Sequence, residues 1–413
     1  MGYSKQAIIG VSWMTAFRVV TRIIAFVRII ILARLLVPSQ FGIFGIASLV
    51  LIFLEILTET GINVFLVQKK EDIEKYIDTS WMVSIARGIL MSLVIIMSTP
   101  LIIKFYNVSA AYSVLLVAAL VPLVRGFINP SVAKFQKDLK FNKQFYYNSS
   151  QFFVESLATI IIIFFTRSPI GLVWGLVVGA VFEVFLSFFA VKPLPKPVFN
   201  KSLFAEVLSR GKWVTISGVF SYFFQNGDNI VVGKMIGISA LGIYDMTYRI
   251  SILPITEVAD VISKVTFPVY VKISHDLRRL KWAFLKTILT VSFLCVPIGF
   301  IFFVFPKEII VLLLGSKWIE AIPVLQILAI FGVIRAISGI STTVFLSVKK
   351  QEYAAIVMFI SFLILAITIV PLVKIFGLVG AGISALAASV AALPVIVYFL
   401  MKIFSGKSEN KLI

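Results

Sequence analysis

Five arginines stand within long apolar stretches of the first half of the sequence: Arg18, Arg22, Arg28, Arg87 and Arg125. An arginine side chain stays charged, and its planar guanidinium binds carboxylates and phosphates through paired hydrogen bonds. A charge at the centre of a bilayer costs about 2.5–3.5 kcal/mol on insertion scales, so these side chains are expected to face protein or a water-filled cavity. We therefore predict that they form a basic site for the anionic headgroup of a substrate.

Three glutamates in the same half are the predicted charge partners of these arginines: Glu55, Glu59 and Glu155. Arg18 and Glu55 lie at nearly the same depth if their two stretches cross a membrane in opposite directions, so an ion pair between them is expected. A purely structural set of buried ion pairs is the alternative interpretation. Under the binding hypothesis, the glutamates hold the arginines at rest and phosphate replaces them during transport.

A second polar group interrupts the apolar pattern of the other half, at Asp228 and Asn229 and then at Asp245 and Arg249. Asp228 and Arg249 are expected at similar depths, so an ion pair between them is one interpretation. The other is a site for ion coupling or gating that links transport to a H⁺ or Na⁺ gradient. The sequence has one histidine and one cysteine, so a His/Cys metal site is excluded and no cofactor is expected.

These residues must be positioned by membrane-spanning helices. The chain of 413 residues is 60% hydrophobic and 14% charged, and its mean hydropathy is +1.05. Its apolar runs have the length that a helix needs to cross a bilayer. The sequence predicts an all-α polytopic membrane protein with about 12 transmembrane helices, at 8–33, 41–66, 78–103, 112–133, 145–166, 170–191, 213–233, 241–263, 284–305, 321–346, 353–374 and 377–402.

The connections between the predicted spans alternate in charge. On the side of the N-terminus they are rich in lysine and arginine, as in Lys134, Lys137, Lys140 and Lys143, whereas each connection on the other side holds one or two such residues. Because basic connections stay cytoplasmic, both termini are predicted to be cytoplasmic. The formal net charge of +19 is thus explained by topology, and no nucleic-acid partner is expected.

An internal repeat relates the two halves of the chain. At a separation of 200 residues Trp13 matches Trp213, and RLLVPSQFGIF aligns with KMIGISALGIY. Six spans separate the copies, so the halves have the same orientation, and the sequence predicts two parallel six-helix bundles around a central cavity. The predicted parts are an N-terminal bundle, a cytoplasmic linker, a C-terminal bundle and a cytoplasmic tail, at 1–191, 192–212, 213–402 and 403–413.

Three segments resemble a known family of membrane transporters. They are ARLLVPSQFGIFGIASLVLIFLEILTETGINVFLVQKK (33–70), KFQKDLKF (134–141) and DNIVVGKMIGISALGIYDMTYRISILPITEVADVISKVTFPVYVKI (228–273). They are similar to segments of the polysaccharide transporter family, the Wzx-type flippases of lipid-linked oligosaccharides. That family lies in the multidrug/oligosaccharidyl-lipid/polysaccharide exporter superfamily. The similarity extends over most of the chain.

The resemblance implies a flippase that moves a polyprenyl-diphosphate oligosaccharide from the cytoplasmic to the outer leaflet of a bacterial or archaeal cell membrane. It implies alternating access, membrane lipids and a polysaccharide polymerase with other assembly proteins as partners, and a monomer is expected. A peptidoglycan-precursor flippase and a cation-coupled drug antiporter of the same superfamily remain alternatives. An enzyme is not expected, because the predicted connections are too short for a catalytic domain.

Overall fold

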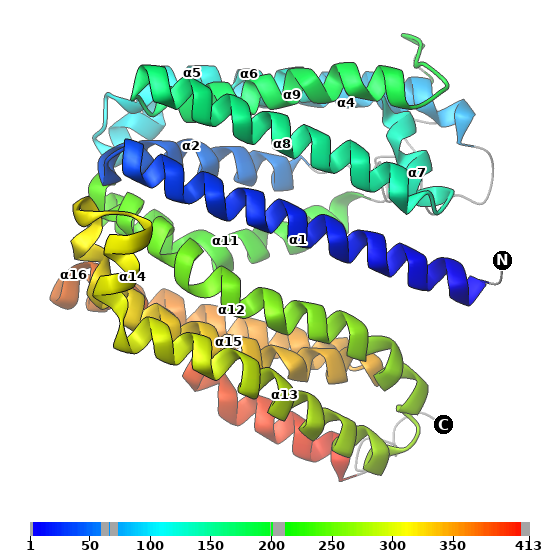
Figure 1. Ribbon diagram of the computed structural model, residues 1–413, viewed down its shortest axis with the longest axis vertical. Coiled ribbons are helices and arrows are strands. Elements are labelled where there is room, and N and C mark those ends of the chain that lie inside the picture. The colour runs from blue at the N-terminus through cyan, green and yellow to red at the C-terminus, as the bar shows by residue number, and fades with distance from the viewer. Residues whose placement is uncertain (1–2, 59–65, 67–72, 199, 201–210, 406–413) are drawn as a thin grey trace. The chain divides into compact units, whose positions relative to one another are not determined.

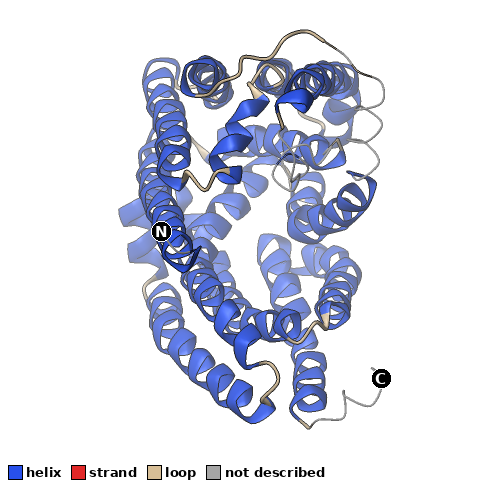
Figure 2. Ribbon diagram, turned by 90° about the vertical axis from the view of Figure 1, so that its right-hand side faces the viewer, coloured by secondary structure: helices blue, strands red, loops and turns tan. Residues whose placement is uncertain are grey.

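The computed structural model describes residues 3–58, 66, 73–198, 200 and 211–405. Within these ranges the regular elements are all helices, and no strand occurs (Figure 2). The chain divides into two compact units, Met1–Asn226 and Gly227–Ile413. The predicted cavity between the halves stays a prediction.

The first unit contains the first six predicted spans and most of the seventh. Figure 1 labels its helices. Its helices are α1 (Tyr3–Leu35), α2 (Pro38–Leu57), α4 (Glu74–Tyr106), α5 (Ala111–Ala118), α6 (Leu120–Arg125), η1 (Pro130–Val132), α7 (Ala133–Lys137), α8 (Phe141–Thr166) and α9 (Ile170–Ala190). Helix α8 packs on α1 and α9, while α6 packs on α4 and α9. Residues 211–226 of α11 (Gly211–Met235) also belong to this unit, where the hydroxyl of Tyr222 donates to the carbonyl of Leu49 at 2.9 Å.

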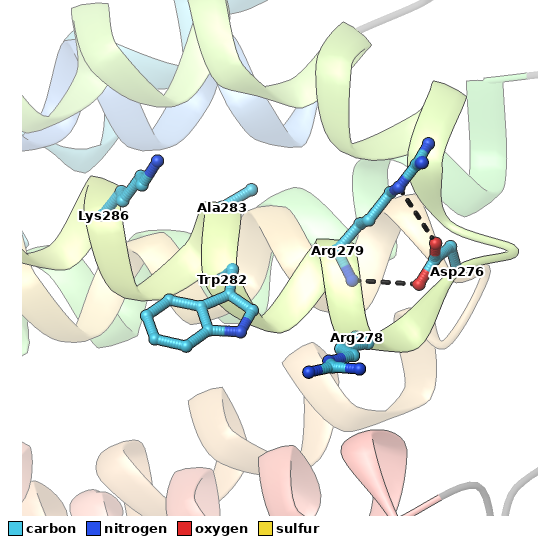
Figure 3. A pocket seen from close by; sticks show the side chains of 6 residues that line it. All are labelled: Asp276, Arg278, Arg279, Trp282, Ala283 and Lys286. Carbon is cyan, nitrogen blue, oxygen red and sulfur yellow. Dashed lines mark hydrogen bonds and ion pairs between the residues drawn. The ribbon is translucent and has the colours of Figure 1, made fainter.

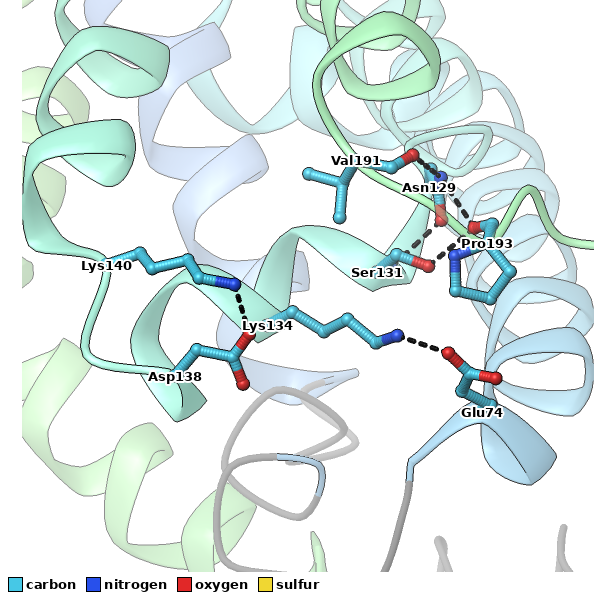
Figure 4. Close-up of polar contacts among 8 residues, drawn as sticks. All are labelled: Glu74, Asn129, Ser131, Lys134, Asp138, Lys140, Val191 and Pro193. Atoms are coloured by element: carbon cyan, nitrogen blue, oxygen red, sulfur yellow. Dashed lines mark hydrogen bonds and ion pairs between the residues drawn. The ribbon is translucent and has the colours of Figure 1, made fainter.

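The fourth predicted span is broken rather than continuous. Helices Ala111–Arg125 and Pro130–Lys137 meet at an angle of 68°. Asn129 stabilises the break: its Oδ1 accepts from the amide of Ser131 at 2.9 Å, and its Nδ2 donates to the carbonyls of Val191 and Pro193 (Figure 4). A broken helix inside a membrane protein needs such partners, because its freed backbone groups have no water to bind.

The second unit is built around α15 (Ile322–Ser347). This helix packs against α12 (Ile238–Ile273), α13 (Leu277–Val304) and α16 (Gln351–Phe404). The core between α12, α13 and α15 contains fully buried Ile255, Leu280 and Ile340. Two short elements between α13 and α15, which the sequence did not predict, are α14 (Pro306–Leu313) and η2 (Ser316–Ala321).

Helix α16 combines the last two predicted spans. Its 54 residues exceed the length needed for one crossing, and the helix is interrupted at Gly377, where φ is 57° and ψ is −133°. This left-handed backbone favours glycine, because a side chain would clash with the carbonyl. The break therefore lies where the sequence separates 353–374 from 377–402.

The fold confirms the prediction of an all-helical polytopic membrane protein. In the described residues, seven helices are long and apolar enough to cross a membrane, or eight if the bent pair is one span. The helices α1, α11 and α12 cover further predicted spans at 8–33, 213–233 and 241–263, where polar residues reduce the apolar character. The end of the second span and part of the predicted linker lie outside the described residues.

Candidate functional site

A network of charged side chains joins α1, α6, α8 and α9 of the first unit. Glu155 of α8 lies at its centre and is only 5% exposed. Its Oε1 accepts a hydrogen bond from Nη1 of Arg28 at 3.0 Å, and its Oε2 accepts from Nε2 of Gln151 at 3.1 Å. The guanidinium of Arg28 also lies over the ring of Phe152, 5.2 Å from its centroid. Arg28 is therefore held by a short ion pair and an aromatic face.

Arg125 belongs to the same network but is held more loosely. Its Nη2 lies 4.0 Å from Oε2 of Glu155, and its Nε lies 3.9 Å from Oε2 of Glu183 on α9. These contacts are too long for hydrogen bonds, and the buried Nε has no hydrogen-bond partner. The side chain of Arg125 is 36% exposed. Arg125 thus keeps donors that a phosphate oxygen could accept from.

A row of glycines positions Glu155. Gly171, Gly175 and Gly179 recur at intervals of four on α9 and face α8. A Cβ atom added at Gly179 would lie 2.7 Å from Cβ of Glu155, and one at Gly175 would lie closer still to the side chain of Thr159. Because only glycine leaves this space, the two helices approach closely and the carboxylate is fixed between them.

Arg87 is placed by a second close approach, between α4 and α6. A Cβ atom at Gly88 would lie 2.4 Å from the carbonyl oxygen of Pro122. Arg87 donates from Nε to the hydroxyl of Thr58 at 3.0 Å and from Nη2 to the backbone carbonyl of Glu55 at 2.8 Å. The structure therefore places Arg87 in contact with the backbone of Glu55, and the ion pair expected between Arg18 and the Glu55 carboxylate stays a prediction.

The remaining predicted residues of the first half are Arg18, Arg22 and Glu59. Arg18 and Arg22 follow one another on α1 at an interval of four, half-buried and exposed respectively. Glu59 lies outside the described residues. The binding role of all five arginines stays a prediction, while the geometry assigns Arg28 and Arg125 to one network.

The predicted polar residues of the second unit separate into two sets of contacts, one around Asp228 and one between Asp245 and Arg249. Asp228 is 5% exposed; its Oδ2 accepts from the hydroxyl of Tyr244 at 3.0 Å and its Oδ1 from the amide of Asn229 at 2.8 Å. Arg249 instead binds Asp245, from Nε to Oδ2 at 2.8 Å. The expected pair of Asp228 with Arg249 is thus replaced by a pair within one helix, because residues four apart on a helix already face each other.

Several polar residues of these networks were not among the predicted site residues: Gln151, Glu183, Tyr244, Tyr248 and Arg335. The guanidinium of Arg335 donates to the hydroxyl of Tyr248 and lies over the ring of Phe331. Their positions in otherwise apolar spans were visible in the sequence. Their partners depend on which helices are neighbours, which the sequence does not state.

The comparison with known sequences points to cell-surface polysaccharides. Residues 31–323 match the profile of the family described as polysaccharide biosynthesis protein. The chain is 24% identical over 341 residues to the lipopolysaccharide biosynthesis protein WzxC of Escherichia coli, covering 82% of this chain and 69% of WzxC. It is 23% identical over 355 residues to the teichuronic acid biosynthesis protein TuaB of Bacillus subtilis, covering 85% of this chain and 73% of TuaB.

The comparison with solved structures gives the same fold. The lipid II flippase MurJ, in an inward closed conformation, superposes with a TM-score of 0.78 at 17% identity, over 96% of this chain and 90% of MurJ. An inward-facing multidrug resistance transporter of the MATE family gives a TM-score of 0.69 at 16% identity, over 94% of this chain and 96% of that one.

Proposed function

The chain belongs to the polysaccharide biosynthesis protein family, and from this premise we propose that it is a flippase for a lipid-linked oligosaccharide. The cargo is a polyprenyl-diphosphate oligosaccharide, moved from the cytoplasmic to the outer leaflet of the cell membrane by alternating access. Relatives named for lipopolysaccharide and teichuronic acid biosynthesis support a role in the assembly of a surface polysaccharide.

The observation that carries this proposal is the uneven pairing of Arg28 and Arg125 around Glu155. Arg28 is bound at 3.0 Å, whereas Arg125 remains 3.9–4.0 Å from its two carboxylates with donors to spare. A diphosphate carries several acceptor oxygens and binds guanidinium groups in a bidentate way. In this proposal the headgroup engages Arg125 first and competes with Glu155 for Arg28.

The same glutamates favour release of the diphosphate headgroup. When the diphosphate leaves, Glu155 and Glu183 again neutralise the two arginines, so the empty site does not keep an uncompensated buried charge. A site without these carboxylates would hold the anionic headgroup more tightly and slow its departure. Coupling to a H⁺ or Na⁺ gradient through Asp228 is part of this proposal, as are a cytoplasmic position for both termini and the cell membrane as the location.

The proposal is tested by flipping in proteoliposomes. A fluorescent polyprenyl-diphosphate oligosaccharide is loaded in both leaflets, and its exposure to a membrane-impermeant quencher is followed for the wild type, Arg28→Gln and Arg125→Gln. Loss of charged hydrogen bonds to the headgroup should slow flipping by about ten- to a hundredfold. Arg125→Lys keeps the charge without the planar guanidinium, so its flipping rate should lie between those of the wild type and Arg125→Gln. Lys104→Gln, an exposed cation at the end of α4, is the matched control and should flip normally.

Three other cargoes distinguish the alternatives. A peptidoglycan precursor and a cationic dye are offered in the same vesicles, together with a polyprenyl phosphate that lacks sugar. Transport of the peptidoglycan precursor in preference to the oligosaccharide would replace the proposed cargo, and transport of the dye alone would make the protein a drug antiporter. Normal flipping of the oligosaccharide by both arginine variants would make the network structural and refute the proposed headgroup site.

A further inference from the structure

A basic pocket lies at the beginning of α13, far along the chain from the arginine network. It has a volume of about 550 Å³ and is lined by Asp276, Arg278, Arg279, Trp282, Ala283 and Lys286. Figure 3 looks onto this face of α13, with Arg278 and Trp282 toward one edge and Arg279 and Lys286 toward the other. The pocket belongs entirely to the second unit.

The pocket keeps a net positive charge. Asp276 is largely used within the protein, because it caps α13 by accepting from the amide of Arg279 at 3.0 Å and pairs with Nε of the same residue at 3.2 Å. Among the described residues, Arg278 and Lys286 form no ion pair. Three cations thus surround one carboxylate, and their ends reach solvent: the side chain of Arg279 is 77% exposed.

An apolar stripe continues from the pocket along the same helix face. Trp282, Leu289, Phe293 and Phe300 are spaced by seven, four and seven residues, which places them in line on α13. They are 61%, 68%, 79% and 62% exposed, and α13 is one of the helices long and apolar enough to cross a membrane. Trp282 lies between Arg279 and Lys286 at the start of the apolar stripe, and a tryptophan among cations is typical of the membrane–water interface.

We propose that this face binds an anionic phospholipid, with its phosphate headgroup among Arg278, Arg279 and Lys286 and an acyl chain along the stripe from Trp282. The cations lie at positions 278–286 and the apolar stripe continues to Phe300, so the charged end and the apolar length of this face complement the headgroup and the acyl chain of such a lipid. Juxtamembrane cations attract anionic lipids, with a contribution of about fivefold in affinity for each one. The proposal concerns a bilayer lipid and holds whatever cargo the protein moves.

The test measures lipid selectivity without transport. The full-length protein is placed in nanodiscs of phosphatidylcholine with a small share of phosphatidylglycerol whose acyl chains carry bromine, and quenching of Trp282 is obtained from the difference between the wild type and Trp282→Phe. The triple variant Arg278→Gln/Arg279→Gln/Lys286→Gln should lose the preference for phosphatidylglycerol, by about fivefold for each cation removed. High salt should weaken the preference of the wild type in the same direction.

A matched control removes the same charge from the same region. Lys264, Lys272 and Lys281 are exposed, lie beside the pocket in sequence and do not line it, so Lys264→Gln/Lys272→Gln/Lys281→Gln should keep the preference. Equal loss in both triple variants would reduce the effect to general charge attraction and overturn the proposal. So would equal quenching by brominated phosphatidylcholine, or displacement of phosphatidylglycerol by a polyprenyl diphosphate at equal concentration.

Discussion

Replacing Glu155 by glutamine should strongly destabilise the first unit. Glu155 is 5% exposed and bonds Arg28 and Gln151 while lying within 4.0 Å of Arg125. Removing one partner of a buried ion pair costs about 3–5 kcal/mol, because the other charge stays buried without compensation. Glutamine keeps one acceptor oxygen, so Glu155→Gln is expected near the lower end, at about 3 kcal/mol.

The loss is measured by equilibrium unfolding in mixed micelles with increasing sodium dodecyl sulfate, followed by tryptophan fluorescence. Asp138→Asn is the control, because Lys140 and Asp138 form an ion pair of 2.8 Å, slightly shorter than the 3.0 Å of Arg28 and Glu155, with side chains that are 52% and 40% exposed. An exposed pair contributes about 0–1 kcal/mol, so this variant should barely change the free energy of unfolding.

A double-mutant cycle then separates the ion pair from general damage. Arg28→Gln combined with Glu155→Gln should be less destabilised than the sum of the single variants, with a coupling of about 1–3 kcal/mol. If Glu155→Gln cost no more than Asp138→Asn, or if the two changes added within about 0.5 kcal/mol, the pair would not stabilise the unit. The resting state that we propose for the headgroup site would then have to be abandoned.

Three further substitutions are tested in the same unfolding assay. Gly179→Ala should reduce the free energy of unfolding by about 1–3 kcal/mol, since the new Cβ would lie 2.7 Å from Cβ of Glu155. Gly227→Ala, which has nothing within 4 Å of its new Cβ, should be neutral or stabilising by up to about 1 kcal/mol. Similar effects of the two substitutions would contradict the packing argument. Tyr244→Phe removes the hydroxyl that donates to buried Asp228 and should cost about 1–3 kcal/mol; an unchanged stability would show that this hydrogen bond contributes little.

The helices could be predicted from the sequence because each apolar run has the length of a bilayer. The predicted spans fall on helices even at α16, where two of them form one element divided at Gly377. The bend in the fourth span was not predicted. Hydrogen bonds between Asn129 and the chain near Pro193 stabilise it, and residues 64 positions apart leave no periodic signal.

The charged residues could be identified, but their partners could not. Depth alone suggested Arg249 for Asp228, yet two residues at equal depth meet only if their side chains face each other, and Arg249 instead binds Asp245. The glycine row in the sequence indicates a helix neighbour more directly than depth does: Gly171, Gly175 and Gly179 at intervals of four predict a close helix contact. Such a contact selects which side chains of the next helix are buried, and Glu155 is one of them.

The hydrogen bonds of Asn129 also join the bend in the fourth span to the end of α9. The amide of Asn129 donates to the hydroxyl of Ser187 on α9, and its side chain donates to the carbonyls of Val191 and Pro193 just beyond that helix. Separating these groups would leave a buried amide unbonded, at about 1–3 kcal/mol. The end of α6, which carries Arg125, is therefore tied to the point where the chain leaves α9. A displacement of the chain at Val191 and Pro193 would also displace Arg125.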